Sequence, residues 1–317
     1  MLSRLLACLT AVALLFPGFT LLAQSGTKPH SIWSVEWSAD GRYIAIGGDD
    51  GMLRIHSGTN YQLLQTHALG VEIKCLSWHP KESWLAIATS RGLHLYDVDR
   101  HQLTAVAAIT VGGRAVDWHP AGEWLALADG NGVVQILNRQ GTLLQTIKKH
   151  NQNSFVTVHW HPTENKLLTG SDEMIMFDSS GKQLAFIRHR TENTLLLTAR
   201  WHPSGKWFAS GDYGHAEEGI PTVLQFWKED GTLIQTVMGH GKEIRNLRWS
   251  KDGNTLATGS DGLRLWSKDG KLLHEARTQD VVWGVSWDPT GTRLVTATFE
   301  GQVEIWSNSA NLLKKLY

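Results

Sequence analysis

Short apolar segments separated by turn residues recur at a regular interval along most of the chain. Seven six-residue segments end in tryptophan, at Trp37, Trp78, Trp118, Trp160, Trp201, Trp249 and Trp287. Each is followed by a turn sequence such as HPAG, SKDG or DPTG, in which Pro, Asp and Gly favour chain reversal. A second apolar segment such as WLAIAT follows, then a third such as LRLW, and in most repeats a fourth such as GTLLQTI. Four β-prone segments with turns between them predict one four-stranded antiparallel sheet.

The interval between the tryptophans is about 40 residues, a length typical of propeller repeats. One four-stranded sheet cannot bury both of its faces, whereas seven sheets stacked around an axis cover one another and close a ring. We therefore predict an all-β, seven-bladed β-propeller of four-stranded antiparallel blades. The repeats fill residues 24–317, which we expect to form a single domain.

The first strand of each repeat has an irregular spacing. Its large apolar residues, for example Ile244, Leu247 and Trp249, are separated by three positions and then two. A regular strand would place them two and two apart. The extra residue predicts a β-bulge in every blade, which turns the residue after the first apolar one toward a loop end.

The charge balance and the cysteines exclude some roles. The chain has 30 Lys plus Arg and 30 Asp plus Glu, so its formal net charge is zero. No overall field attracts nucleic acid or anionic lipid, and we expect no nucleic-acid partner. Cys8 lies in the N-terminal segment and Cys75 is alone in the rest, which leaves no intramolecular disulfide after removal of that segment.

The N-terminal segment differs from everything after it. Arg4 supplies a positive charge, residues 5–16 form an apolar run, Pro17 interrupts it, and Ala23 is a small residue suited to cleavage. These features predict a secretory signal peptide over residues 1–23, a periplasmic or secreted protein, and no membrane span after cleavage. The alternative is an uncleaved leader that tethers the protein to a membrane, because the apolar stretch approaches spanning length.

The repeats resemble those of the WD40-repeat family over essentially all of residues 24–317. The best match is GHGKEIRNLRWSKDGNTLATGSDGLRLW, residues 239–266. In that family a His, a Ser or Thr, an Asp and a Trp form a structural hydrogen-bonded network within a blade, here His240, Thr258, Asp261 and Trp266. In the fourth repeat part of this network corresponds to His150, Thr169 and Asp172. The family often closes its ring with a strand borrowed from the N-terminus. Here NLLKKLY at the C-terminus completes the seventh blade by itself, so the sequence does not say how the ring is closed.

The resemblance implies a rigid, monomeric scaffold that binds proteins, with no catalysis and no cofactor. In that family the position four residues before each first-strand tryptophan faces the narrow top of the propeller. Here it holds Trp33, Lys74, Arg114, Val156, Leu197, Arg245 and Trp283. Trp33 and Trp283 belong to neighbouring blades of a closed ring, so we expect them side by side with cations next to them, as in interface hot spots. Alternatively, both tryptophans only pack against adjacent blades.

The fifth repeat carries the single insertion, between its second and third strands. This loop lies on the same predicted top face, where a longer loop commonly carries specificity, so Tyr213 and His215 join the predicted partner site. The spacing of Asp212, His215, Glu217 and Glu218 is not diagnostic of a metal site. The histidines of the WHP turns are spread around the ring and do not converge on a metal, so we interpret them as turn residues: His79, His119, His161 and His202.

The rival function class is an enzyme that uses the central channel. The residue before each first-strand tryptophan is Glu36, Ser77, Asp117, His159, Arg200, Arg248 or Ser286. A carboxylate and a histidine near an arginine suit acid–base chemistry, but a hydrated, mutually neutralising channel lining explains the same residues. The sequence has no nucleophile elbow, phosphate loop or HExxH motif. We predict a protein without catalytic residues.

Overall fold

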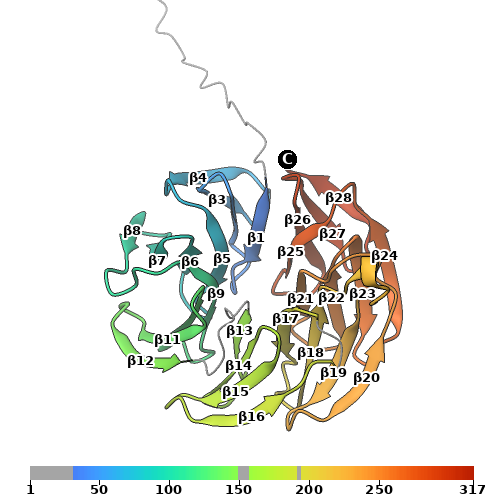
Figure 1. Cartoon of the computed structure of the whole chain (residues 1–317). Coiled ribbons are helices and arrows are strands. Elements are labelled where there is room, and N and C mark those ends of the chain that lie inside the picture. Colours follow the sequence, from blue (N-terminus) through green and yellow to red (C-terminus); the bar gives the residue numbers. More distant parts are fainter. Residues whose placement is uncertain (1–30, 149–156, 191–193) are drawn as a thin grey trace, which may run out of the picture.

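The chain folds into seven four-stranded antiparallel sheets arranged as a ring, which confirms the seven-bladed β-propeller (Figure 1). The computed structural model describes residues 31–148, 157–190 and 194–317. The predicted leader at residues 1–23, His150 and Val156 lie outside these ranges. No helix within them is long and apolar enough to cross a membrane.

Each blade pairs its strands in chain order, and its first strand lies nearest the centre of the ring (Figure 1). Blades 1 to 4 are formed by β1 (Ile32–Trp37), β2 (Tyr43–Gly48), β3 (Met52–Ser57), β4 (Leu63–Ala68); β5 (Ile73–Trp78), β6 (Trp84–Thr89), β7 (Gly92–Asp97), β8 (Gln102–Ala105); β9 (Gly113–Trp118), β10 (Trp124–Asp129), β11 (Val133–Asn138), β12 (Leu143–Lys148); β13 (Thr157–Trp160), β14 (Lys166–Gly170), β15 (Met174–Asp178) and β16 (Gln183–Ile187). Blades 5 to 7 are formed by β17 (Leu196–Trp201), β18 (Trp207–Asp212), β19 (Leu224–Lys228), β20 (Leu233–Val237); β21 (Asn246–Trp249), β22 (Thr255–Gly259), β23 (Gly262–Ser267), β24 (Leu272–Arg277); β25 (Val282–Trp287), β26 (Arg293–Thr298), β27 (Val303–Ser307) and β28 (Leu312–Lys315).

The predicted bulge is present in the first strand of blades 1, 2, 3, 5 and 7, where the register with the second strand shifts. In β1 the shift leaves Trp33 unpaired between Ile32 and Ser34. In blade 6 the backbone N–H of Arg245 donates to the oxygen of Gly259 at 3.0 Å, although the next residue is already paired with this glycine. The corresponding residue of blade 4, Val156, is outside the described ranges.

The hydrophobic core lies between the blades. Buried clusters join residues of neighbouring sheets; for example, Leu53 and Ile55 of β3 pack with Leu76 and Leu85 of blade 2. Six of the seven first-strand tryptophans are buried, and Trp249 is half-buried. Because both faces of a blade are covered in this way, its middle strands read as apolar runs.

The WHP histidines do more than form turns, because three of them also fasten their blade to the next one. Their Nε2 atoms bond to the carbonyl oxygen of a turn glycine at 2.9–3.0 Å, in the pairs His79 and Gly122, His161 and Gly205, and His202 and Gly253. Their Nδ1 atoms accept backbone N–H groups of their own turns, which fixes the Nε2–H tautomer. Burial lowers the pKa of these three imidazoles.

The ring closes between blades 7 and 1. Blade 7 supplies all four of its strands from β25 to β28, as the sequence predicted, and no strand is exchanged within the described ranges. At the centre, the backbone N–H of Trp37 donates to Ser286 Oγ at 3.0 Å. Farther from the centre, Tyr317 packs against the core of blades 1 and 7, and its hydroxyl bonds to His56 Nε2 at 2.7 Å. Tyr317 thus latches the ring by side-chain contacts with blade 1, and Figure 1 shows the C-terminus next to that blade.

Candidate binding cavity at the top face

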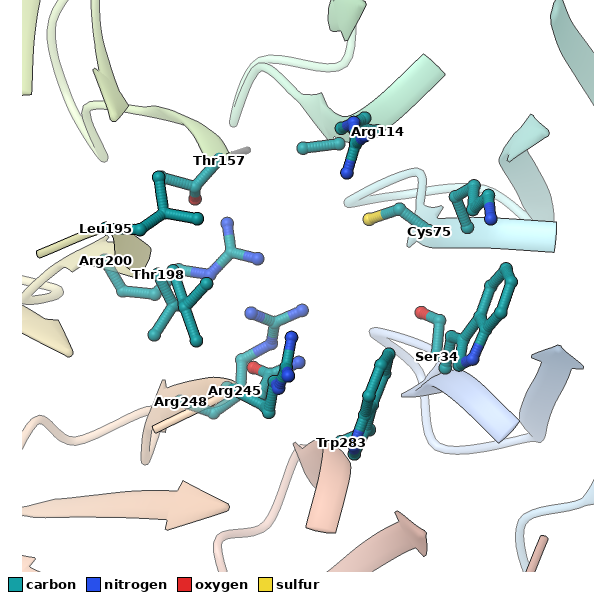
Figure 2. A pocket seen from close by; sticks show the side chains of 15 residues that line it. Ser34, Cys75, Arg114, Thr157, Leu195, Thr198, Arg200, Arg245, Arg248 and Trp283 are labelled. Atoms are coloured by element: carbon teal, nitrogen blue, oxygen red, sulfur yellow. The ribbon is translucent and has the colours of Figure 1, made fainter. Parts of the chain in front are cut away.

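The bulged residues gather at one end of the central channel. We call the face that carries the loops into each first strand the top face, and the cavity of about 370 Å³ that opens there the top cavity. Its rim is formed by residues from six blades, namely Trp33, Lys74, Arg114, Leu197, Arg245 and Trp283. Below the rim lie the smaller side chains Ser34, Cys75 and Thr198, and the guanidinium groups of Arg200 and Arg248 point into the centre (Figure 2). The volume is typical of a site for a small ligand or a few side chains.

Four rim residues form a continuous assembly, which we call the rim stack: Lys74, Trp33, Trp283 and Arg245. The rings of Trp33 and Trp283 stack with a centroid distance of 6.2 Å and an interplanar angle of 24°. Lys74 Nζ lies 3.6 Å from the centroid of Trp33, and Arg245 Cζ lies 4.2 Å from that of Trp283. The rim stack thus places cations on two indoles, with one residue from each of blades 2, 1, 7 and 6.

Two glutamates hold the cations of the rim stack over the rings. Lys74 Nζ lies 2.7 Å from Glu72 Oε2, and Arg245 Nη2 lies 2.9 Å from Glu243 Oε1. Arg114, on the same rim, is exposed and makes no hydrogen bond or ion pair with another residue of the described ranges. The rim therefore has two tethered cations and one that is available.

The inserted loop of blade 5 extends the rim stack outward. It connects β18 to β19 and contains the short helix η1 (Ala216–Glu218). The ring of Tyr213, which is 42% exposed, has its centroid 5.8 Å from Arg245 Cζ. His215 meets that ring edge-on at 5.4 Å. The structure therefore brings both predicted loop residues to the edge of the rim stack.

Asp212 anchors this loop from inside the protein. Its side chain is fully buried, and Oδ1 accepts the backbone N–H of Val223 at 2.8 Å. Oδ2 lies 3.3 Å from His189 Nε2 and 2.9 Å from Arg190 Nη1. These bonds engage both carboxylate oxygens of Asp212, so they give the residue a structural role.

Blade 5 thus has a buried polar network that the sequence analysis missed. It consists of His189, Asp212 and the nearby pair Ser210 and Trp227, in which Trp227 Nε1 donates to Ser210 Oγ at 2.9 Å. His189 follows an arginine, whereas His240 of the matching blade 6 network follows a glycine, so the sequence does not mark His189 in the same way. Counting back from Trp227 in the third strand would have located it.

In blade 6 the structure links three of the four residues of the predicted network. Thr258 Oγ1 bonds to His240 Nε2 at 2.9 Å and to Trp266 Nε1 at 3.0 Å. Asp261 instead pairs with Arg264 at 2.6 Å, and His240 Nδ1 has no hydrogen-bond partner in the described part of the chain. Burial lowers the pKa of His240 to about 3, so this imidazole is neutral and serves the blade.

The channel residues that precede the first-strand tryptophans also serve the ring. Four of them accept the backbone N–H of the tryptophan in the next blade at 2.8–3.3 Å, in the pairs Ser77 and Trp118, Asp117 and Trp160, His159 and Trp201, and Ser286 and Trp37. Arg248 hydrogen-bonds to Glu36. This pattern explains the polar channel lining through contacts between blades.

Two titratable groups of the channel are engaged by the backbone of the next blade. Burial raises the pKa of Asp117 to about 6, and burial lowers the pKa of His159 well below its usual value. His159 Nε2 lies 3.7 Å from Asp117 Oδ2, but each of the two side chains already accepts a backbone N–H. Burial also raises the pKa of the Cys75 thiol, which keeps it protonated.

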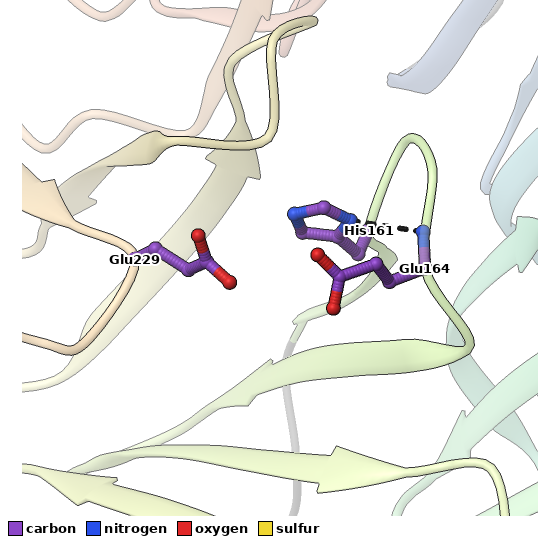
Figure 3. A group of neighbouring side chains, drawn as sticks. All are labelled: His161, Glu164 and Glu229. Carbon is purple, nitrogen blue, oxygen red and sulfur yellow. Dashed lines mark hydrogen bonds between the residues drawn. The ribbon is translucent and has the colours of Figure 1, made fainter.

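One cluster has the residue types of a metal site. His161, Glu164 and Glu229 lie close together near the seam between blades 4 and 5 (Figure 3). Both ring nitrogens of His161 are engaged, Nε2 with Gly205 and Nδ1 with the backbone N–H of Glu164. The ammonium group of Lys166 pairs with both carboxylates. The contacts describe an ion-pair cluster, and they leave no ring nitrogen available for a metal.

Comparison with known families finds the repeat described as WD domain, G-beta repeat. It matches residues 21–57, 141–177, 231–267 and 267–307. These stretches end in the third strands of blades 1, 4, 6 and 7, namely β3, β15, β23 and β27. The three matches that begin at residues 141, 231 and 267 each contain the fourth strand of one blade and the first three strands of the next, so the sequence repeat is offset from the blade by one strand.

The chain is also similar to parts of several curated proteins. The chromatin assembly factor 1 subunit FAS2 homolog of Oryza sativa subsp. japonica is 26% identical over 191 residues, which cover 54% of this chain and 36% of that protein. Protein HIR1 of Cryptococcus neoformans var. neoformans serotype D is 28% identical over 130 residues, 35% of this chain and 14% of that protein. Protein transport protein SEC13 of Yarrowia lipolytica is 26% identical over 109 residues, 29% of this chain and 36% of that protein. The matches thus span only 14% to 36% of these relatives.

Proposed function

We propose that this seven-bladed β-propeller, which matches the WD40 repeat over four stretches, is a non-catalytic scaffold that binds a protein partner through the top cavity and the rim stack. The observation that carries the proposal is the pair of stacked indoles, Trp33 and Trp283, flanked by the cations of Lys74 and Arg245. Tryptophan and arginine gathered at one point of a surface are the composition of a binding hot spot.

The arrangement of the rim stack favours binding over packing alone. Both indoles are half-buried and line an open cavity, so one part of each ring stays available to a partner. The side chains come preordered, because Glu72 and Glu243 tether the cations over the rings. A preordered surface loses little conformational entropy when a partner binds.

The relatives support a role of this general kind. The Oryza sativa protein is named as a homolog of one component of chromatin assembly factor 1, and therefore of a protein that works within a larger assembly. A propeller that presents one rigid face is suited to such assembly, since its specificity depends on rim residues and loops and not on the shared fold.

We also propose that the scaffold works outside the cytoplasm, as a periplasmic or secreted protein. The support is the sequence of residues 1–23, with Arg4, an apolar run and a small residue at Ala23. Mass spectrometry of the protein purified from its own cells tests this, and we expect an N-terminus at Gln24. A chain that keeps residues 1–23 would instead be tethered to a membrane.

Partner capture from the native cell tests the proposed function. The tagged chain is compared with the double variant Trp33→Ala plus Trp283→Ala and with the control double variant Trp84→Ala plus Trp124→Ala, whose tryptophans are also half-buried but lie outside the top cavity. We expect the first variant to lose the partner and the control to retain it, with thermal unfolding showing that both fold. Equal recovery by both variants would show that binding does not use the rim stack.

A further inference from the structure

The top cavity holds a buried guanidinium that forms no ion pair with a carboxylate of the described residues. Arg200 is only 8% exposed. Its Nη1 donates to the carbonyl oxygen of Val158 at 3.3 Å, and its Nε has no hydrogen-bond partner in the described part of the chain. The neighbouring Arg248 differs, because it hydrogen-bonds to Glu36. The guanidinium of Arg200 points into the cavity (Figure 2) and offers its Nε–H as an unsatisfied donor among the described residues.

Burying a charge without an ion-pair partner costs free energy, because the charge loses its hydration. Burial, and then the charge of Arg248, lower the pKa of Arg200 to about 10, so the guanidinium still carries its proton at neutral pH. Buried polar groups in folded proteins are almost always hydrogen-bonded, and an exception calls for an explanation. A ligand that completes the hydrogen bonds of Arg200 is such an explanation.

A second available cation stands above it on the rim. Arg114 is exposed and unpaired among the described residues, whereas Lys74 and Arg245 are tethered by glutamates. The rim and floor positions are three residues apart along a first strand, which corresponds to a depth of about 10 Å. Leu195 and Leu197 line one side of this passage. An anion entering the top cavity would meet Arg114 first and Arg200 last.

We propose that the top cavity receives the carboxylate of an aspartate or glutamate side chain from the protein partner, with Arg200 as its main hydrogen-bond donor and Arg114 at the entrance. This inference rests on the proposed function, because the acidic side chain belongs to the bound partner. A guanidinium offers several donors in one plane and matches a carboxylate in geometry as well as charge.

The surroundings favour a single carboxylate over a polyanion. Glu72 and Glu243 lie beside the rim cations, and Glu36 and Asp117 occupy the same repeat position in the channel as Arg200. A nucleic-acid backbone crossing the top face would meet these carboxylates, and the zero formal net charge supplies no compensating field. One acidic side chain carries a single charge, so it meets less of this repulsion than a polyanion does.

An NMR titration of the full chain tests the inference. The reporters are the indole Nε1–H signals of Trp33 and Trp283, which border the top cavity. The probes are the capped peptides acetyl-Gly-Gly-Glu-Gly-Gly-amide, its Gln counterpart, and a pentaglycine with a free C-terminal carboxylate. We expect the Glu peptide to shift both signals and the other two to leave them unchanged. Arg200→Met and Arg114→Met should each weaken binding of the Glu peptide tenfold or more, since each removes a charge-assisted contact. The control Arg100→Met, whose side chain is 75% exposed and outside the cavity, should not weaken it.

Each other outcome overturns the inference. Equal shifts with the Glu and Gln peptides would show that charge is not recognised, and binding of the pentaglycine alone would show a site for a chain terminus. No shift with any probe would show that the top cavity does not take carboxylates. Because Arg114 is exposed, its variant decides the question even if Arg200→Met does not fold. The proposed function is judged separately. If the tryptophan double variant loses its partner but both arginine variants keep it, the result supports the scaffold function and contradicts the carboxylate site.

Discussion

Trp33 and Trp283 stack with ring centroids 6.2 Å apart, although one belongs to the first blade and the other to the last. This contact joins the two ends of the ring, so we expect it to contribute to stability as well as to form a surface. A double-mutant cycle with Trp33→Ala and Trp283→Ala, measured by urea unfolding, should give a coupling free energy of about 0.5–1.5 kcal/mol. A coupling of zero would mean that the stack does not help to close the ring.

The histidines between blades predict a loss of stability in mild acid. The pKa of His79, His161 and His202 is lowered from 6.5 in the folded protein, first of all by burial. The unfolded chain therefore binds more protons below that value, so the stabilisation is present above pH 6.5 and is lost as the pH falls through it.

Urea unfolding between about pH 8 and pH 5 measures this effect. His202→Gln should reduce the slope of the unfolding free energy against pH, because one ring with a lowered pKa is removed. His274→Gln is the control, because this side chain is exposed on β24, and we expect its slope to match that of the unaltered chain. A free energy of unfolding that does not change between these pH values would contradict the account of the blade seams.

The glycine that faces His202 should tolerate no side chain. Gly253 has a φ of +73°, and a Cβ there would lie 2.3 Å from His202 Nε2. Gly253→Ala should therefore destabilise the protein both by strain and by breaking the seam bond, by about 2 kcal/mol or more. Gly219→Ala isolates the strain, because its φ of +75° is similar but nothing lies near its Cβ. Equal free energies of unfolding for both variants would show that the histidine contact does not matter.

The charge of Arg200 should control the titration of Asp117. Burial raises the pKa of Asp117 to about 6, and the positive charge of Arg200 opposes that rise. Arg200→Met should therefore raise the pKa of Asp117 further, as followed by carbon NMR of its carboxyl group. Lys251→Met, at an exposed turn, should leave the pKa where it is. A lower pKa in Arg200→Met would mean that the two groups do not interact as the structure implies.

Repeated features of the fold were predictable from the sequence, whereas features that depend on a pair of blades were not. The spacing of Trp37 and its equivalents predicted seven sheets, and the extra residue in the first strand predicted the bulge that leaves Trp33 unpaired. The bond from His202 to Gly253 was not predicted, because it requires the exact placement of one turn against the next blade. Asp261 pairs with Arg264 and not with His240. The family pattern names only the four network residues, so it does not reveal that an arginine competes for the carboxylate.

In the candidate site, too, the features that repeat in each blade were predictable and the contacts between particular side chains were not. The position four residues before each first-strand tryptophan located the rim residues, since a bulge at a constant place in the repeat aims them at the same face. The unpaired state of Arg200 escaped the sequence analysis, because arginine and nearby acids in the same repeat position suggested mutual neutralisation. Only the geometry shows that Glu36 bonds to Arg248 and Asp117 to a backbone N–H.

Site-specific photo-crosslinking tests the central claim, that the top face binds a protein partner, most directly. Phe299 is 48% exposed, and its ring centroid lies 5.3 Å from that of Trp283. Phe186 is 45% exposed on β16, the outermost strand of blade 4. Each is replaced in turn by p-benzoylphenylalanine, and the chain is irradiated in its own cells. The account predicts a crosslinked partner from position 299 that disappears when Trp33→Ala is added, and none from position 186. The same partner crosslinked from position 186 but not from position 299 would contradict it.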